Sequence, residues 1–135
     1  MKNVTAKQAY QALLEDPSAR LIDVRTDAEW AFVGLPDLSE AGKQAVLIPW
    51  QVFPSMKLNE QFVQQLEADG ITRDHKLFFI CRSGARSAHA AQAAEAAGFT
   101  SADNVAEGFE GPVDRTGHRG TIAGWKADGL PWRQR

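Results

Sequence analysis

The chain has one cysteine, and charged and small residues follow it directly. This segment, which joins an apolar run to an alanine-rich stretch, reads Cys81-Arg82-Ser83-Gly84-Ala85-Arg86-Ser87. A reactive group between a buried strand and the next helix lies where parallel sheets place their ligand sites. A tight loop there directs backbone N–H groups inward, and the helix dipole adds positive potential, so the loop binds anions. We therefore predict that Cys81 is a nucleophilic thiolate in an anion-binding loop of residues 82–87.

An inert core residue is the alternative interpretation of this cysteine, because free cysteines are commonly buried as small apolar groups. Two arginines, a glycine and a helix start directly after Cys81 favour the reactive interpretation. The amides that stabilise a thiolate would also stabilise a persulfide, in which the cysteine carries a second sulfur atom.

Each side chain of the predicted loop has an expected role. Arg82 is expected to face solvent, where it attracts an anionic donor or is an ordinary surface arginine. Arg86 is expected to brace the loop through a carboxylate rather than to hold the anion. Ser83 and Ser87 are expected to donate hydrogen bonds to the persulfide or the loop, and Ser87 has helix capping as an alternative. Gly84 allows the backbone to turn without a clash at Cβ.

Three residues around the end of an earlier apolar run are expected to support the loop. Asp23 and Arg25 lie at the end of this run, at the sheet edge where we expect Cys81. Asp23 is predicted to pair with loop amides or an arginine, since a carboxylate close to the sulfur would disfavour a thiolate. Glu29 is predicted to pair with an arginine. The histidines are dispersed, so we predict no metal site and no cofactor.

Composition excludes several classes of protein. The chain has 135 residues and a formal net charge of −2, which predicts one domain over 1–135 with no general attraction to nucleic acid or acidic membranes. One cysteine cannot form an internal disulfide. The N-terminal residues lack the apolar core of a signal peptide, and no apolar run has the length of a membrane span. We therefore expect a cytoplasmic protein with a reduced thiol.

Hydrophobic periodicity and capping signals predict strands and helices in alternation. Capping boxes begin at Thr5 and Thr26, and Asn59 is the expected cap of a third helix that Gly70 ends. The predicted strands are 21–24, 45–49, 76–80 and 102–105. The other predicted helices are 87–97 and 122–128, and loops are expected over 34–44 and 108–120. This order predicts an α/β protein with a mostly parallel sheet flanked by helices.

Three sets of residues together resemble the single-domain form of the rhodanese family of sulfurtransferases. They are Asp23-Val24-Arg25 with Glu29-Trp30, the segment from Cys81 to Ser87, and Asn104-Val105 with Gly108-Phe109, Trp125 and Gly129-Leu130-Pro131-Trp132. The resemblance implies a rhodanese-like three-layer sandwich and a thiosulfate sulfurtransferase. In such an enzyme the cysteine takes sulfur from a small anionic donor such as thiosulfate, and a persulfide forms. Cyanide, or an external thiol on a small molecule or a protein, then accepts this sulfur.

The chain departs from the family pattern in places that leave its substrates open. Val33-Gly34-Leu35-Pro36 stands where many relatives have Gly-His-Ile-Pro-Gly-Ala, and the loops 34–44 and 110–120 are longer. Related cell-cycle phosphatases and arsenate reductases have five residues between cysteine and arginine, whereas this loop has four, with Ser87 in seventh place. The shorter loop favours a single sulfur atom over a tetrahedral oxyanion. A non-catalytic binding or regulatory module is the other alternative.

Overall fold

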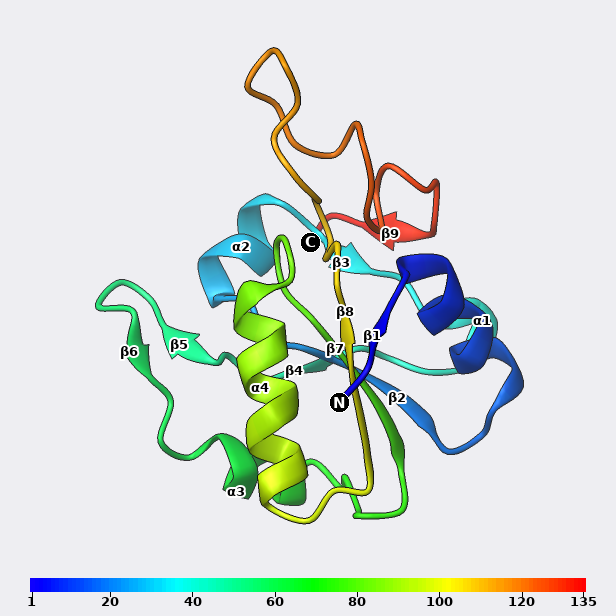
Figure 1. Cartoon of the computed structure of the whole chain (residues 1–135), viewed down its shortest axis with the longest axis vertical. Coiled ribbons are helices and arrows are strands. Elements are labelled where there is room, and N and C mark those ends of the chain that lie inside the picture. Colours follow the sequence, from blue (N-terminus) through cyan, green and yellow to red (C-terminus); the bar gives the residue numbers. More distant parts are fainter.

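The computed structural model describes residues 1–135, in which strands and helices alternate (Figure 1). The strands are β1 (Asn3–Val4), β2 (Ala19–Asp23), β3 (Leu35–Pro36), β4 (Val46–Leu47), β5 (Gln51–Val52), β6 (Lys57–Leu58), β7 (Lys76–Ile80), β8 (Ser101–Val105) and β9 (Trp132–Arg133). The helices are α1 (Ala6–Glu15), α2 (Asp27–Phe32), α3 (Phe62–Ala68) and α4 (Ala85–Ala96), with a 3₁₀ turn at Ser39–Ala41.

Five strands form one parallel sheet in the order β1-β8-β7-β2-β4. The central pair, β2 and β7, is in register from Ala19 opposite Lys76 to Asp23 opposite Ile80. The carboxyl ends of these two strands therefore meet, and Cys81 follows β7 at this edge. The predicted α/β class with a mostly parallel sheet is confirmed.

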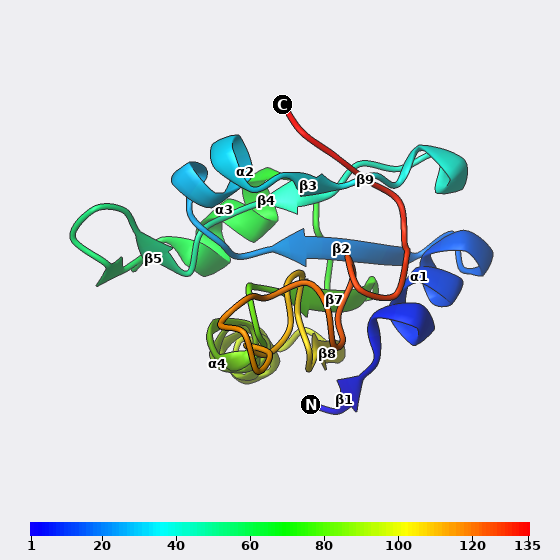
Figure 2. The same cartoon turned by 90° about the horizontal axis from the view of Figure 1, so that it is seen from above.

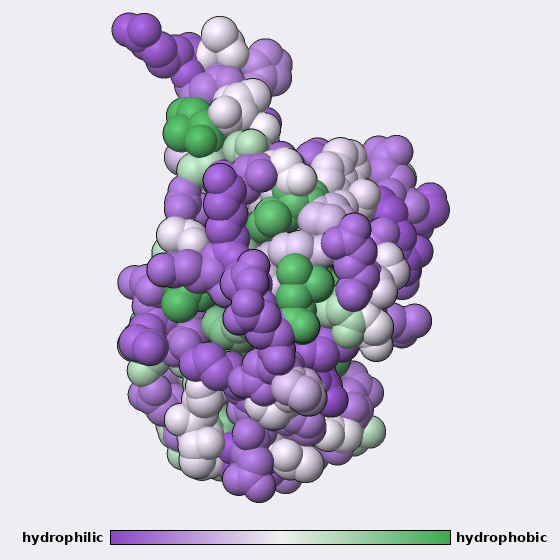
Figure 3. Space-filling model, turned by 90° about the vertical axis from the view of Figure 1, so that its right-hand side faces the viewer, coloured by the Kyte–Doolittle hydropathy of each residue, from purple (hydrophilic) through white to green (hydrophobic).

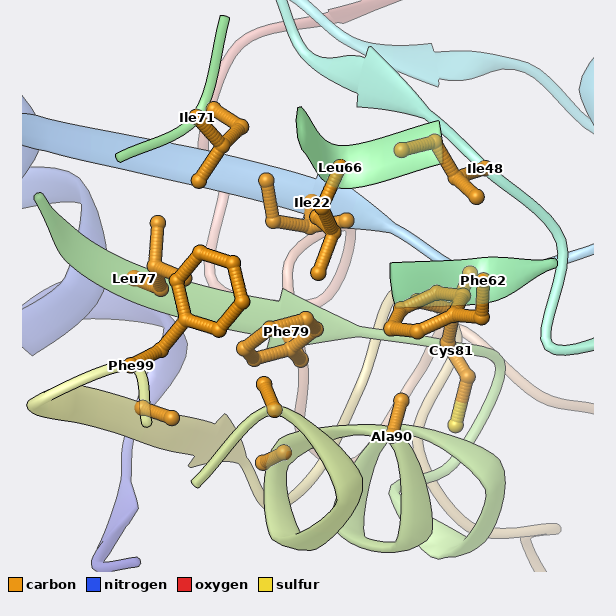
Figure 4. Close-up of a cluster of buried hydrophobic side chains, with 14 residues drawn as sticks. Ile22, Ile48, Phe62, Leu66, Ile71, Leu77, Phe79, Cys81, Ala90 and Phe99 are labelled. Carbon is orange, nitrogen blue, oxygen red and sulfur yellow. The ribbon is translucent and has the colours of Figure 1, made fainter. Parts of the chain in front are cut away.

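Helices cover both faces of the sheet, so the core has two layers of apolar side chains (Figure 2). On one face, α3 and α4 pack against a cluster that includes Ile22, Phe79 and Cys81 (Figure 4). On the other face, α1 packs against a cluster that includes Leu21, Phe78 and Trp125. Neighbouring strand residues face opposite layers, which explains the continuous apolar runs in the sequence.

Local signals begin two of the helices as the sequence predicts. Thr5 caps α1, and the side chain of Gln8 accepts a hydrogen bond from the Thr5 backbone N–H. Thr26 and Glu29 form the equivalent capping box at α2. These boxes satisfy amides that a helix start would leave without partners.

The predicted helix over 122–128 is wrong, because tertiary hydrogen bonds take its backbone groups. The N–H of Trp125 donates to the carbonyl of Gly108, and the N–H of Lys126 donates to the carbonyl of Phe109. Gly124 lies so close to this segment that a Cβ atom would be 2.9 Å from the Gly108 carbonyl oxygen. The stretch consequently forms turns that follow residues 108–111.

Two other helix starts differ from the prediction. Asn59 is not the cap of α3: the helix begins at Phe62 after Gln61, and the Asn59 carboxamide accepts from the Gln61 N–H and donates to the Pro49 carbonyl. Helix α4 begins at Ala85, two residues earlier than predicted, because Gly84 is its N-cap at φ 107°.

The sequence analysis missed several strands of two residues. Strand β3 lies in the predicted loop 34–44 and pairs with β9 near the end of the chain, and β5 pairs with β6 in a hairpin. The loop 110–120 projects at the top of the molecule and is hydrophilic at its tip (Figure 3). None of the helices is long and apolar enough to cross a bilayer.

Candidate active site

The Cys81 side chain lies beside the first turn of α4. Cys81 is 1% exposed, and its sulfur points from the end of β7 toward this helix (Figure 4). The backbone N–H groups of Gly84 and Ser87 lie 3.1 and 3.4 Å from Sγ, and the Ser87 hydroxyl oxygen lies 3.2 Å from it. Three polar groups therefore converge on the sulfur, and the two amides favour negative charge there.

A neighbouring loop fixes the backbone of the cysteine loop. The N–H of Phe109 donates to the Cys81 carbonyl at 2.8 Å, and the N–H groups of Glu110 and Gly111 donate to the Arg82 carbonyl. Gly108 makes this approach possible, because a Cβ there would lie 2.5 Å from the Arg82 carbonyl oxygen. These hydrogen bonds hold both carbonyls away from the sulfur. A carbonyl oxygen close to the sulfur would repel an anion bound there.

Asn104 connects the sulfur-binding turn to the sheet, and sequence reasoning missed this role. Its side-chain oxygen accepts from the Ser87 hydroxyl at 2.6 Å, and its amide donates to the Gly84 carbonyl at 3.2 Å and to the Asn3 side chain at 3.1 Å. Ser87 therefore contacts Sγ as a buried residue of the first helical turn and is not the N-cap. A polar residue in the buried strand β8 was the available signal.

Glu29 pairs with Arg86 and braces the loop from α2. The guanidinium donates two hydrogen bonds to the carboxylate, at 2.6 and 2.9 Å. Burial raises the pKa of Glu29, but the hydrogen bond and charge of Arg86 and hydrogen bonds from Thr26 outweigh it, so the net pKa is lowered. The hydrogen bond to Glu29 likewise raises the pKa of Arg86, against burial. Both terminal nitrogens of the Arg86 guanidinium are therefore bound to Glu29.

Cys81 is one of the residues that line a cavity of about 360 Å³. Arg82 and Ser83 line it and are exposed, and Arg82 forms no ion pair. The remaining lining residues come from the cysteine loop, α2 and the hairpin: Glu29, Gln51, Met56, Cys81, Ala85 and Arg86. The cavity is therefore lined by the single cysteine and by one cation, Arg82, that has no carboxylate partner.

Asp23 and Arg25 form a buried ion pair behind the loop and do not line the cavity. Their side chains meet at 2.7 Å with no exposed surface, and Arg25 also donates to the Gly34 carbonyl. The guanidinium lies 4.3 Å from the centroid of the Phe109 ring, whose backbone holds the Cys81 carbonyl. The pair therefore supports the loop indirectly. No cluster of three or more His, Cys, Asp or Glu side chains is placed to hold a metal ion.

The family model described as the STR4 middle domain matches residues 1–135. The chain belongs to this family. The crystal structure of Rv0390 from M. tuberculosis is 47% identical, with a TM-score of 0.91 over 100% of this chain and 98% of that one. A chloroplastic thylakoid rhodanese-like protein of Oryza sativa subsp. indica is 29% identical over 129 residues, which are 96% of this chain and 24% of that protein.

A further structure carries the same fold. The polysulfide-sulfur transferase homodimer from Wolinella succinogenes is 23% identical, with a TM-score of 0.66 over 100% of this chain and 80% of that one. At this identity the likeness concerns the fold alone. This member of the STR4 middle domain family therefore has the rhodanese-like α/β fold, and the predicted resemblance to rhodanese-like proteins is confirmed.

Proposed function

We propose that the protein is a sulfurtransferase that carries sulfur as a persulfide on Cys81. The observation that carries this proposal is the convergence of the Gly84 and Ser87 amides on Sγ of a cysteine that lines a cavity. An inert core cysteine requires neither the two amides nor the cavity. The sulfurtransferase-type fold supports the same chemistry.

The first half-reaction loads the cysteine from a small anionic donor such as thiosulfate. The Cys81 thiolate attacks the outer sulfur of thiosulfate, a new S–S bond forms, and the electron pair of the broken S–S bond leaves with sulfite. The products are the Cys81 persulfide anion and sulfite, so atoms and charge balance. Arg82, the cation without a carboxylate partner, attracts the dianion, and the amides of Gly84 and Ser87 bind the persulfide.

The second half-reaction passes the outer sulfur to an external acceptor. Cyanide attacks it, thiocyanate leaves, and the thiolate of Cys81 returns. A thiolate acceptor reacts in the same way and becomes a persulfide itself. Since the chain has no second cysteine, the acceptor is a separate small thiophile or protein thiol. A reducing compartment such as the cytoplasm keeps Cys81 available, and we propose neither nucleic acid nor membrane as a partner.

Hydrolysis of phosphate esters fits this site less well. A loop that holds a tetrahedral oxyanion needs its arginine free to bind two oxygens. Here the Arg86 guanidinium is bound at both ends of its fork to Glu29. This engagement and the four-residue spacing to Cys81 both favour a single sulfur atom as the group that is transferred.

Intact-protein mass spectrometry tests the proposal. The wild type is measured before thiosulfate, after it and after later cyanide, with Cys81→Ser as the matched control. We expect a gain of one sulfur atom on the wild type only, which cyanide removes. A binding module without turnover would show no gain with thiosulfate or with a second persulfide donor, and wild-type gain on Cys81→Ser would reassign the nucleophile.

A further inference from the structure

A second cavity adjoins the one that contains Cys81. It has a volume of about 260 Å³ and is lined by Thr26, Ala28, Glu29, Val33, Phe53 and Met56. Glu29 and Met56 line both cavities. The two cavities therefore lie side by side along one groove between α2 and the β5–β6 hairpin. The proposed sulfur chemistry uses only the first of the two.

The second cavity suits an apolar group. The exposed walls are apolar, since Val33, Phe53 and Met56 contribute them, and Phe53 is 53% exposed. Its two polar residues already have partners: the hydroxyl of Thr26 donates to Glu29, and Glu29 binds Arg86. A polar ligand group would find no free partner there and would lose hydrogen bonds to water.

Met56 marks the boundary between the cavities. It adopts φ 57°, the left-handed region that non-glycine residues seldom enter, and its N–H donates to the Val52 carbonyl. Non-glycine residues held in this conformation cluster at functional sites. Methionine is a flexible, polarisable side chain that adapts to varied apolar partners, and here it is 40% exposed.

We infer that the acceptor is a cysteine in a peptide segment of a partner protein. In that segment a bulky apolar residue adjoins the cysteine and binds in the second cavity. The inference rests on the proposed function of Cys81. Pockets that enclose small ligands have volumes of about 300–1,000 Å³. The second cavity is smaller and shares Glu29 and Met56 with the first. Two adjacent hollows of this size match two neighbouring side chains of one chain better than one small thiol.

The transfer step is an ordinary thiol exchange. The Cys81 persulfide anion that thiosulfate leaves first takes a proton from water. The acceptor cysteine then enters the first cavity as a thiolate and attacks the outer sulfur of the protonated persulfide. The new S–S bond forms on the acceptor as the bond to Sγ breaks, and its electron pair returns to Cys81 as a thiolate. The proton stays on the transferred sulfur, so atoms and charge balance.

Two blocked tripeptides, Gly-Cys-Leu and Gly-Cys-Ser, provide the probe. Wild-type protein is first loaded from thiosulfate, and the rate of sulfur transfer to each peptide is measured by mass spectrometry, with cyanide as a separate acceptor. We expect kcat/KM for the leucine peptide to exceed that for the serine peptide about tenfold, the discrimination that a modest apolar pocket provides. Phe53→Ser is expected to reduce this ratio to about one.

A matched control is available on the same hairpin. Leu58 is also 53% exposed but lines neither cavity, so Leu58→Ser is expected to keep the wild-type ratio. Equal rates for the two peptides with the wild type, or the same loss of the ratio in both variants, would overturn the inference. If cyanide accepts sulfur while the peptides do not differ, only the acceptor class fails. If thiosulfate adds no sulfur to Cys81, the proposed function itself fails.

Discussion

The cysteine loop and the β5–β6 hairpin, which form the loop wall and the hairpin wall of the Cys81 cavity, each contain a residue with positive φ, and the two residues are of opposite kinds. On the loop wall it is Gly84, at φ 107°, where a Cβ would lie 2.0 Å from the Ala106 carbonyl oxygen. On the hairpin wall it is Met56, at φ 57°, exposed and in contact with the cavity. One position excludes any side chain, whereas the other accepts a large one despite its backbone.

In the function that we propose, the loop wall holds the reacting sulfur and the hairpin wall selects the acceptor. The loop wall is held by amides of residues 109–111, by Asn104 and by the ion pair of Glu29 with Arg86. The hairpin wall has only two residue pairs between β5 and β6 and an exposed apolar surface. Reacting atoms need fixed geometry, while an acceptor site gains from side chains that adjust.

The largest expected effect comes from placing a side chain at Gly84 in the loop wall. Gly84→Ala adds a Cβ that must displace the Ala106 backbone, and it holds alanine at positive φ. We expect a loss of roughly 3 kcal/mol in the free energy of unfolding and almost no sulfur gain from thiosulfate. Urea denaturation and intact mass measure both; near wild-type stability would contradict the assigned close contact.

Removing the link between the sulfur-binding turn and the sheet comes next. Asn104→Ala leaves the Ser87 hydroxyl without its acceptor and removes one of the two hydrogen bonds to the Gly84 carbonyl. We expect about 1–3 kcal/mol less stability and persulfide formation about tenfold slower, because the turn loses its fixed position. Stopped-flow loading with thiosulfate gives the rate. Asn3→Ala removes only the outer hydrogen bond, and an equal effect there would show that Asn104 does not position the turn.

The brace between α2 and α4 gives a smaller effect that depends on pH. Glu29→Gln keeps an oxygen for the capping box but loses the charge that pairs with Arg86. Since the folded pKa of Glu29 is lowered, its carboxylate stabilises the fold above the ordinary value of 4.5, and this is lost as pH falls below it. We expect the free energy of unfolding of the wild type to exceed that of Glu29→Gln by about 1 kcal/mol at neutral pH, and this difference to shrink on acidification. Denaturation curves at several pH values measure it. An advantage that grows toward acid would refute the assignment.

The hairpin wall predicts the smallest effect. Met56→Gly relieves the left-handed strain but frees the unfolded backbone, so we expect a change within about 1 kcal/mol in the free energy of unfolding. Thermal denaturation measures it. A loss as large as that of Gly84→Ala would mean that Met56 is a structural residue of the hairpin.

Local signals made much of the fold predictable. Strand β7, both capping boxes and the loop after Cys81 could be read from the sequence because each depends on neighbouring residues. The helix over 122–128 was wrong because carbonyls of Gly108 and Phe109 compete for its N–H groups. No local pattern reports such a distant partner.

The same limit applies to the site. The sequence predicts the cysteine loop and a carboxylate partner for Arg86, since composition and spacing carry both. It does not predict that Asn104 contacts Ser87 across 17 positions, or that the hairpin reaches the cavity. Both depend on which strands lie beside each other, and two-residue strands such as β5 and β6 leave almost no hydrophobic pattern.

The loop around the sulfur takes its partners from distant parts of the chain, and this sets when it can form during synthesis. A nascent chain that has released residues only as far as α4 contains Cys81, but not Asn104 or the amides of 109–111 that hold the loop. Domains form as the chain leaves the ribosome, N-terminal part first. The loop that holds the two amides around Sγ is therefore fixed only once strand β8 and the turns after it have emerged, so the proposed sulfur chemistry belongs to the finished domain and not to the growing chain.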